Sequence, residues 1–163
     1  MATQLLEGER VRSIVGAFYT VYDYYGFGLA EAVYAGALEL ELIRRGHACS
    51  RELTISVAYH GRHVAWQRLD MVIDERVIVE NKATEVLPPY AERQLLNYLR
   101  ASPFPVGLLL HFGPVPKFRR FVDSRKDKAP FALVRQRSRR SRQDVLEPST
   151  VPITVNTIDP NTA

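Results

Sequence analysis

The stretch LDMVIDERVIVENKA, residues 69–83, places three charged side chains beside two apolar runs. Asp70 precedes the first run, and Glu80 follows the second, with Lys82 two positions later. The runs are rich in Val and Ile, which favour buried strands, and an isolated charge in such a place costs several kcal/mol. The carboxylates therefore need something nearby to compensate their charge.

The length of the turn between the two runs decides whether the carboxylates meet. An even-length turn would put Asp70 and Glu80 on opposite faces of the hairpin. A three-residue loop, Asp74–Arg76, would instead make them directly opposed, with Cβ atoms about 5 Å apart. Lys82 would then share their face, because side chains two apart on a strand point the same way. A shared site requires this three-residue loop.

Two opposed carboxylates suit a divalent cation. Mg²⁺ prefers oxygen ligands and is commonly held by one or two carboxylates together with phosphate oxygens. An ammonium beside the metal can orient a water molecule or offset charge that develops on phosphorus. The residues thus favour hydrolysis of a phosphodiester. The alternative is a strand that ends in solvated charges, since such short motifs recur often by chance.

The surrounding periodicity predicts an α/β domain with a mixed sheet. Helices are expected over residues 4–25, 29–45 and 89–101, strands within 52–83 and over 105–112, and an edge strand or a small helix over 117–122. Gly46 is expected to cap the second helix in a left-handed conformation. The buried face of that helix is predicted to contain Ala30, Val33, Tyr34, Ala37, Leu38 and Leu42.

The charge is unevenly distributed. Residues 1–122 hold 14 Lys and Arg against 13 Asp and Glu, and residues 123–163 hold 8 against 5. We expect one domain over 1–122 and a basic, flexible tail over 123–163, which either binds phosphates or only aids solubility. No apolar run is long enough for a membrane span, and the N-terminus lacks a signal-peptide core. A single cysteine fits a cytoplasmic protein.

Three separated segments together resemble the PD-(D/E)XK nuclease superfamily. LDMVIDERVIVENKA is similar to its D…ExK core, and GLAEAVY, residues 28–34, matches the signature of its GxxExxY family. Gln94 and Tyr98 have the QxxxY spacing of RecB-type members. The similarity spans about residues 10–122, in the family's order. It implies a restriction-endonuclease-like core, with a mixed β-sheet flanked by helices.

The resemblance also implies roles for individual residues. Asp70 and Glu80 would be metal ligands, with the main-chain carbonyl of Asn81 as a third. Lys82 would position the nucleophilic water or stabilise the transition state. Glu31 would approach the same site and bind a metal or an activated water. The implied cofactor is Mg²⁺ or Mn²⁺.

Gln94 and Tyr98 lie four residues apart and hence on one helical face. The resemblance implies that they hold metal-site waters and a substrate phosphate, whereas an amphipathic helix alone would also explain them. Asn81 departs from the apolar residue expected between Glu80 and Lys82. Its side chain would face away from Glu80 and would need a hydrogen-bond partner or a partner protein.

Other reactive residue types have simpler explanations. His60 and His63 flank a predicted turn without a third ligand at metal-binding spacing, which favours a surface turn. Cys49 has no histidine dyad and is expected to be a small, partly buried residue. Tyr34 is expected to pack in the core.

The resemblance therefore implies a metal-dependent nuclease that hydrolyses phosphodiester bonds of nucleic acid, with DNA favoured and RNA open. The alternative is a catalytically idle nuclease fold that acts as a nucleic-acid-binding or scaffolding subunit of a larger complex. A phosphoesterase for nucleotide-sized substrates would need an enclosed pocket. A protein partner or a homo-oligomer is left open, and no membrane association is expected.

Overall fold

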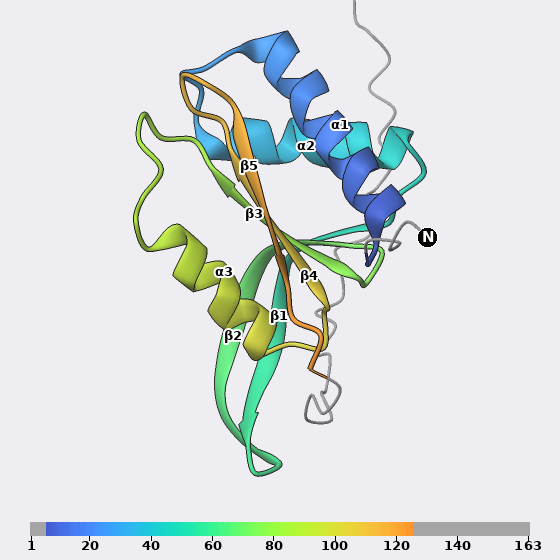
Figure 1. Cartoon of the computed structure of the whole chain (residues 1–163), viewed down its shortest axis with the longest axis vertical. Coiled ribbons are helices and arrows are strands. Elements are labelled where there is room, and N and C mark those ends of the chain that lie inside the picture. Colours follow the sequence, from blue (N-terminus) through green and yellow to red (C-terminus); the bar gives the residue numbers. More distant parts are fainter. Residues whose placement is uncertain (1–5, 126–163) are drawn as a thin grey trace, which may run out of the picture.

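The computed structural model describes residues 6–125, which form two helices, three strands, a third helix and two more strands (Figure 1). They are, in chain order, α1 (Gly8–Tyr25), α2 (Glu31–Arg44), β1 (Cys49–Tyr59), β2 (Arg62–Ile73), β3 (Val77–Lys82), α3 (Ala91–Arg100), β4 (Val106–His111) and β5 (Lys117–Val122). The predicted α/β class is confirmed, and residues 117–122 form an edge strand. Nearly all of the predicted basic tail, residues 126–163, lies outside the described range.

The five strands form one mixed sheet in the order β1-β2-β3-β4-β5. Neighbours pair antiparallel except β3 and β4, which run parallel and are connected through α3. A parallel pair needs such a crossover because the chain must return from the end of β3 to the opposite edge of the sheet before β4 can run in the same direction. The carboxyl ends of β3 and β4 therefore meet at one edge, which is where ligands bind in open α/β sheets.

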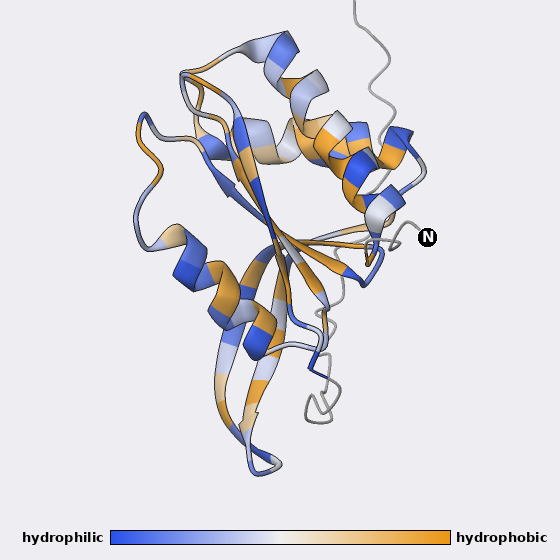
Figure 2. Cartoon of the chain, in the orientation of Figure 1, coloured by the Kyte–Doolittle hydropathy of each residue, from blue (hydrophilic) through white to orange (hydrophobic). Residues whose placement is uncertain are grey.

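Each face of the sheet has its own buried core. Phe18 of α1 and Leu38 of α2 pack with Val79 and Leu108 on one face, and Leu95 of α3 packs with other strand residues on the opposite face. Both α1 and α3 alternate between hydrophilic and hydrophobic residues in Figure 2, as amphipathic helices do. Burying one such aliphatic or aromatic side chain stabilises the fold by about 1.5–3 kcal/mol. No helix within the described range is long and apolar enough to cross a membrane.

The buried face of α2 is narrower than predicted. Tyr34, Leu38 and Leu42 are fully buried, but Val33 and Ala30 are exposed, so their predicted burial is wrong. Ala30 precedes the helix with an extended backbone, and Val33 lies off the i, i+4 stripe that meets the sheet. Periodicity located the helix correctly, whereas the width of its buried stripe depends on how closely α1 and the sheet approach it.

A hydrogen-bonded chain ties α1 to the β2–β3 turn. His47 Nδ1 and Arg10 Nε each donate to Asp74 Oδ2 at 2.7 Å, while Ala48 N–H donates to Asp74 Oδ1 at 2.8 Å. His47 Nε2 lies 2.8 Å from Ser13 Oγ. This Ser–His–Asp order is that of a hydrolytic triad, but Ser13 sits inside α1, where helical bonding occupies the N–H groups that would hold an oxyanion. These hydrogen bonds therefore have a structural role, and we call the set formed by Arg10, Ser13, His47, Ala48 and Asp74 the clasp.

Replacing Asp74 with Ala should weaken this clasp. Burial by itself raises the pKa of Asp74, but the hydrogen bonds from His47, Arg10 and Ala48 outweigh it and hold the pKa below its ordinary value. The stabilisation is thus present above about pH 4 and is lost as pH falls through the lowered pKa. We expect Asp74→Ala to lower the free energy of unfolding by about 2 kcal/mol at pH 7, measured by urea titration followed by circular dichroism.

The same comparison at pH 3.5 should give a smaller difference between Asp74→Ala and wild type. Asp23→Ala, which removes an exposed carboxylate of α1, is the matched control and should change stability by less than about 0.5 kcal/mol. An undiminished difference at pH 3.5 would contradict the role given to the ionised carboxylate.

Candidate active site

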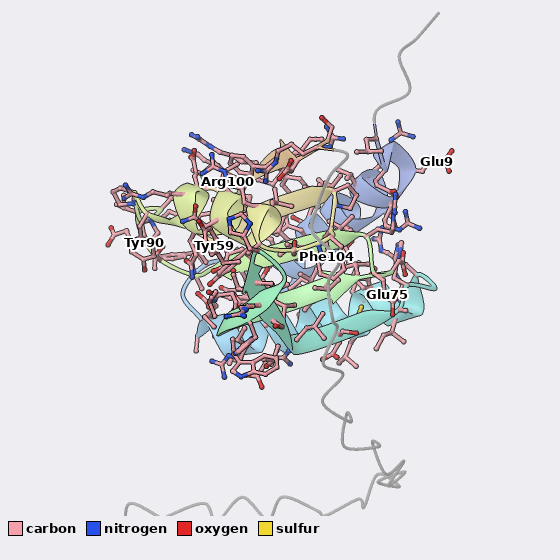
Figure 3. All side chains as sticks on the ribbon, turned by 90° about the horizontal axis from the view of Figure 1, so that it is seen from below. Glu9, Tyr59, Glu75, Tyr90, Arg100 and Phe104 are labelled. Atoms are coloured by element: carbon pink, nitrogen blue, oxygen red, sulfur yellow. The ribbon has the colours of Figure 1, made fainter. Side chains whose placement is uncertain are left out.

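The register of the β2–β3 hairpin makes Asp70 and Glu80 opposed positions. The turn is the predicted three-residue loop, Asp74–Arg76, and the ladder runs outward from it to the pair of Met71 with Val79. Asp70 and Glu80 come next in that register. Asp74 and Glu75 have left-handed φ values, of 51° and 54°, and Glu75 is labelled in Figure 3. The side-chain bonds of Asp74 help to hold this conformation, which costs about 1–2 kcal/mol per residue.

At Asp70, strand β2 has no regular ladder partner in either neighbouring strand, β1 or β3. The β1–β2 register skips Asp70, and Glu52 across from it has a left-handed φ of 53°. The β2–β3 ladder stops at Met71, whereas β3 continues beside β4 as far as Lys82. Asp70 therefore lies at a fork in the sheet, and the end of β3 projects past it.

Glu80 is a carboxylate in a nearly solvent-free position. Its side chain is only 1% exposed, and Lys82 Nζ donates to its Oε1 at 2.6 Å. Its Oε2 is buried without a hydrogen-bond partner. Burial, together with the charge of Asp70, raises the pKa of Glu80 to about 7 against the opposing effect of Lys82. An additional cation at this oxygen would satisfy it.

Lys82 lies within reach of three carboxylates. Burial lowers its pKa, but its hydrogen bond to Glu80 and the charges of Glu80, Glu31 and Asp70 outweigh burial and raise the pKa above its ordinary value. Lys82 is therefore an ammonium at neutral pH. Glu31 is the first residue of α2, and Figure 1 shows that helix starting near the end of β3.

The loop before Glu31 is held by Tyr34. The Tyr34 hydroxyl donates to the Gly26 carbonyl at 2.5 Å and accepts from the Leu29 N–H at 3.2 Å. Gly28 has a φ of 118°, which residues with a Cβ rarely adopt. The Tyr34 ring is fully buried, as predicted, and stacks on Phe112 with centroids 4.4 Å apart. The three residues of the G-x-x-E-x-x-Y pattern thus differ in what they do locally: Gly28 allows the turn, Glu31 carries a charge near Lys82, and Tyr34 holds the loop.

Helix α3 brings Gln94 and Tyr98 to the same region. Gln94 Nε2 donates to Tyr98 Oη at 2.5 Å, and Gln94 Oε1 is buried without a partner. Burial and the charges of Glu80 and Asp70 raise the pKa of Tyr98, although Gln94 and Lys82 lower it. The predicted helix face therefore points toward the two carboxylates, and the Tyr98 hydroxyl keeps its proton at neutral pH.

Asn81 presents its carbonyl and its side chain to different neighbours. The Lys82 carbonyl accepts from Phe112 N–H and so points toward β4. Successive carbonyls of a strand point to opposite sides, so the Asn81 carbonyl points toward the fork at Asp70. The Asn81 side chain is 1% exposed, and its Oδ1 has no partner, which costs about 1–3 kcal/mol. The expected hydrogen-bond partner for this amide oxygen is not found among residues 6–125.

The oxygens at the fork fit a hard divalent cation. The unpartnered Glu80 Oε2, the nearby Asp70 carboxylate and the Asn81 carbonyl are ligand types that Mg²⁺ accepts. No group of three or more His, Cys, Asp or Glu side chains comes together as a metal site in the described range. Glu31 is therefore near Lys82 without completing a three-carboxylate set.

The other reactive residues lie elsewhere, in agreement with their simpler explanations. His63 lies 2.8 Å from Ser56 Oγ and contacts the ring of Trp66, while His60 occupies the hairpin turn with a φ of 47°. Figure 3 looks from this hairpin end, near the labelled Tyr59. Cys49 is half-buried, and burial raises its pKa to about 11.

One neighbour of the site was not predicted. His111 ends β4 and is the parallel partner of Lys82. It stands at the carboxyl end of an apolar strand, which is a usable signal. That signal has no value until the strand order is known, because only the parallel pairing of β3 with β4 brings His111 next to Lys82.

A protein-family model described as the PD-(D/E)XK nuclease superfamily matches residues 8–121, from α1 to β5. The chain belongs to the PD-(D/E)XK nuclease superfamily. No curated protein and no solved structure matches it. Nuclease-type chemistry thus applies to this PD-(D/E)XK domain at the level of the superfamily.

Titration of Glu80 should be visible in the stability of the PD-(D/E)XK domain. A carboxyl group with a raised pKa is protonated in the folded state between about pH 4.5 and pH 7, so stability falls as pH rises through that window. Without divalent cations, we expect Glu80→Gln to be more stable than wild type at pH 8 by about 1–3 kcal/mol and equal to it near pH 4.5. The control Glu9→Gln, an exposed carboxylate, should follow the wild-type profile. Parallel curves for wild type and Glu80→Gln would contradict the raised pKa.

Removing the Tyr34 hydroxyl should loosen the loop that carries Glu31. Tyr34→Phe keeps the buried ring but breaks both bonds of its hydroxyl, so we expect a loss of about 1 kcal/mol in unfolding free energy. Amide hydrogen exchange over residues 26–30 should become faster. Tyr24→Phe removes an exposed hydroxyl and is the matched control. Unchanged exchange in Tyr34→Phe would show that the loop does not depend on this clamp.

Proposed function

We propose that this chain is a metal-dependent nuclease that hydrolyses phosphodiester bonds of nucleic acid, with DNA as the favoured substrate and Mg²⁺ or Mn²⁺ as cofactor. The observation that carries the proposal is the buried Glu80 carboxylate, with one oxygen on Lys82 and the other without a partner, beside Asp70. We also infer membership of the GxxExxY family, supported by the separate places of Gly28, Glu31 and Tyr34. The single half-buried Cys49 supports a cytoplasmic location.

The proposed ligands of the cation are the carboxylates of Asp70 and Glu80 and the carbonyl of Asn81. When bound, the ion supplies Lewis acidity toward a phosphoryl oxygen. Lys82 is protonated at neutral pH, so it acts as a hydrogen-bond donor and a positive charge, not as a general base. In that form it can orient the attacking water or stabilise charge on the transferring phosphoryl group.

The remaining residues act around this centre. Glu31, whose charge reaches Lys82, is placed to bind a water molecule on the α2 side. The protonated Tyr98 hydroxyl and the Gln94 amide supply polar groups toward a phosphate and the waters of the site. These roles follow the superfamily's QxxxY and GxxExxY patterns and are part of the proposal.

A second candidate is a nuclease-fold subunit that binds nucleic acid or scaffolds a complex without catalysis. The observation that favours it is the 2.6 Å ion pair of Lys82 with Glu80, which satisfies both charges in part without a metal ion. This candidate predicts nucleic-acid affinity that is independent of divalent cations.

Cleavage of labelled single- and double-stranded DNA and RNA, with Mg²⁺, with Mn²⁺ and with chelator, tests the proposal. Asp70→Asn, Glu80→Gln and Lys82→Met should each lower kcat/KM by at least about 100-fold, since each removes a group that acts on the transition state. Glu9→Gln, at an exposed position of α1, should leave kcat/KM unchanged. An inert wild-type protein that binds nucleic acid equally well in chelator would favour the second candidate.

A further inference from the structure

Helix α2 carries a second apolar face besides the one that packs on the sheet. Its buried residues are four apart in sequence: Tyr34, Leu38 and Leu42. Each residue of an α-helix turns by about 100°, so Leu40, two positions after Leu38, points away from the core. Leu40 is 71% exposed. The outward side of the helix is therefore apolar at this point.

Apolar residues continue along the whole outward side of α2. They are three or four apart in sequence and therefore line up on the helix surface. We call this set the outer stripe: Leu29, which precedes the helix, Val33, Gly36, Leu40 and Ile43. Its four large side chains are exposed in the part of the chain that the structure describes. A helix that is apolar on all sides is normally buried, which indicates that another surface covers the outer stripe.

Charged pairs border the outer stripe on both flanks. On one flank, Glu39 accepts a hydrogen bond from Arg51 of β1 at 3.3 Å. On the other flank, Glu41 accepts from Arg44 at 2.8 Å. An apolar centre with a polar rim is the usual anatomy of a protein–protein interface. Because both pairs are already matched in charge, a partner has to supply mainly apolar surface.

The outer stripe is complementary to a second copy of itself in the antiparallel direction. With a two-fold axis at Gly36, a residue before Gly36 meets the residue equally far after Gly36 on the other copy. Leu40 then meets the small, exposed Ala32, and Ile43 meets Leu29. Large side chains thus face small or apolar ones, and the glycine at the axis allows the two helices to approach closely.

The charges at the ends of α2 also favour the antiparallel direction. Glu31 lies in the first turn of the helix, and Arg44 lies in the last turn. A parallel pair would bring like charges together at both ends, which is unfavourable. An antiparallel pair instead sets Arg44 of each copy at the end of the other helix that carries Glu31.

We propose that two copies of this chain associate through the outer stripe, as an antiparallel α2–α2 dimer with its two-fold axis at Gly36. The pairing covers Leu29, whose N–H donates to the Tyr34 hydroxyl in the loop just before Glu31. Each copy would therefore steady the Glu31 loop of the other. The inference does not depend on the proposed nuclease function.

Sedimentation velocity of the full chain over a micromolar dilution series tests the dimer. Wild type should dissociate reversibly from dimer to monomer on dilution. Leu40→Glu should raise the dimer dissociation constant at least about 100-fold, because each dimer would bury two unpaired carboxylates. Val64→Glu makes a similar change at an exposed aliphatic residue of the β1–β2 hairpin and should leave the dissociation constant unchanged.

Disulfide trapping tests the geometry of the dimer. In a Cys49→Ala background, Gly36→Cys should form a disulfide with its own copy when a mild oxidant is added. Packed helices have axes about 8–10 Å apart, which brings Cα atoms at the two-fold axis within the reach of a disulfide, about 4.4–6.8 Å. A Cβ at Gly36 would lie 3.9 Å from Arg51 Nη1, an ordinary contact distance, so the new side chain has room. Val33→Cys should not be trapped, because about 9 Å of helix separates its two copies.

Three results would overturn the inference. The first is a full chain that stays monomeric throughout the series, which would leave residues 126–163 or a different protein as the cover of the outer stripe. The second is a dimer whose dissociation constant is unchanged in Leu40→Glu. The third is trapping of Val33→Cys as readily as Gly36→Cys, which would indicate a parallel pair. Metal-dependent cleavage is measured separately, so its failure leaves the dimer unaffected.

Discussion

The structure depends most on a carboxylate that is placed inside a sheet. Glu80 lies on a central strand directly after three buried aliphatic residues, Val77–Val79, and is 1% exposed, so its charge has lost nearly all of its hydration. Such a group must find compensation in its immediate surroundings or give up its charge. Lys82 compensates one oxygen, and the other is buried beside Asp70 without a hydrogen-bond partner. Lys82, Asp70 and Tyr98 all lie close enough to this one buried charge to affect, or be affected by, its ionisation.

Helix α1 braces both ends of the sheet around that charge. In its first half, Arg10 bonds Asp74 of the β2–β3 turn directly, and Ser13 reaches that turn through His47. In its second half, the Tyr22 hydroxyl donates to the Gly113 carbonyl of the β4–β5 hairpin at 2.7 Å. The turn fixes the register that opposes Asp70 to Glu80. The hairpin carries the glycine against which His111 packs. One helix therefore sets the geometry on both sides of β3.

Much of this arrangement can be predicted from local patterns in the sequence. Helical periodicity located α1, α2 and α3, and hairpin geometry reduced the opposition of Asp70 and Glu80 to one question, whether the turn has two or three residues. A loop length carries that information because side chains alternate strictly along a strand. The three-residue loop excludes the opposite arrangement by geometry alone.

The rest depends on contacts between distant parts of the chain, which local patterns do not contain. The bond between His47 and Asp74 spans 27 residues, and the pairing of Lys82 with His111 spans 29 positions of the numbering. The exposure of Val33 follows from the packing of α2 on its neighbours and not from its own type. Likewise, the lack of a hydrogen-bond partner for Asn81 Oδ1 depends on which side chains pack on that face of β3, and these come from other parts of the chain.

The hairpin of β1 and β2 has a practical consequence for spectroscopy. It carries the chain's one tryptophan, Trp66, which is 56% exposed and in contact with His63 rather than with either core. Its emission will respond to the conformation of the hairpin and to any molecule that binds there, but it will be insensitive to the packing of the two cores. A change in tryptophan fluorescence can therefore occur without unfolding, and unfolding of the two cores can go unseen by it.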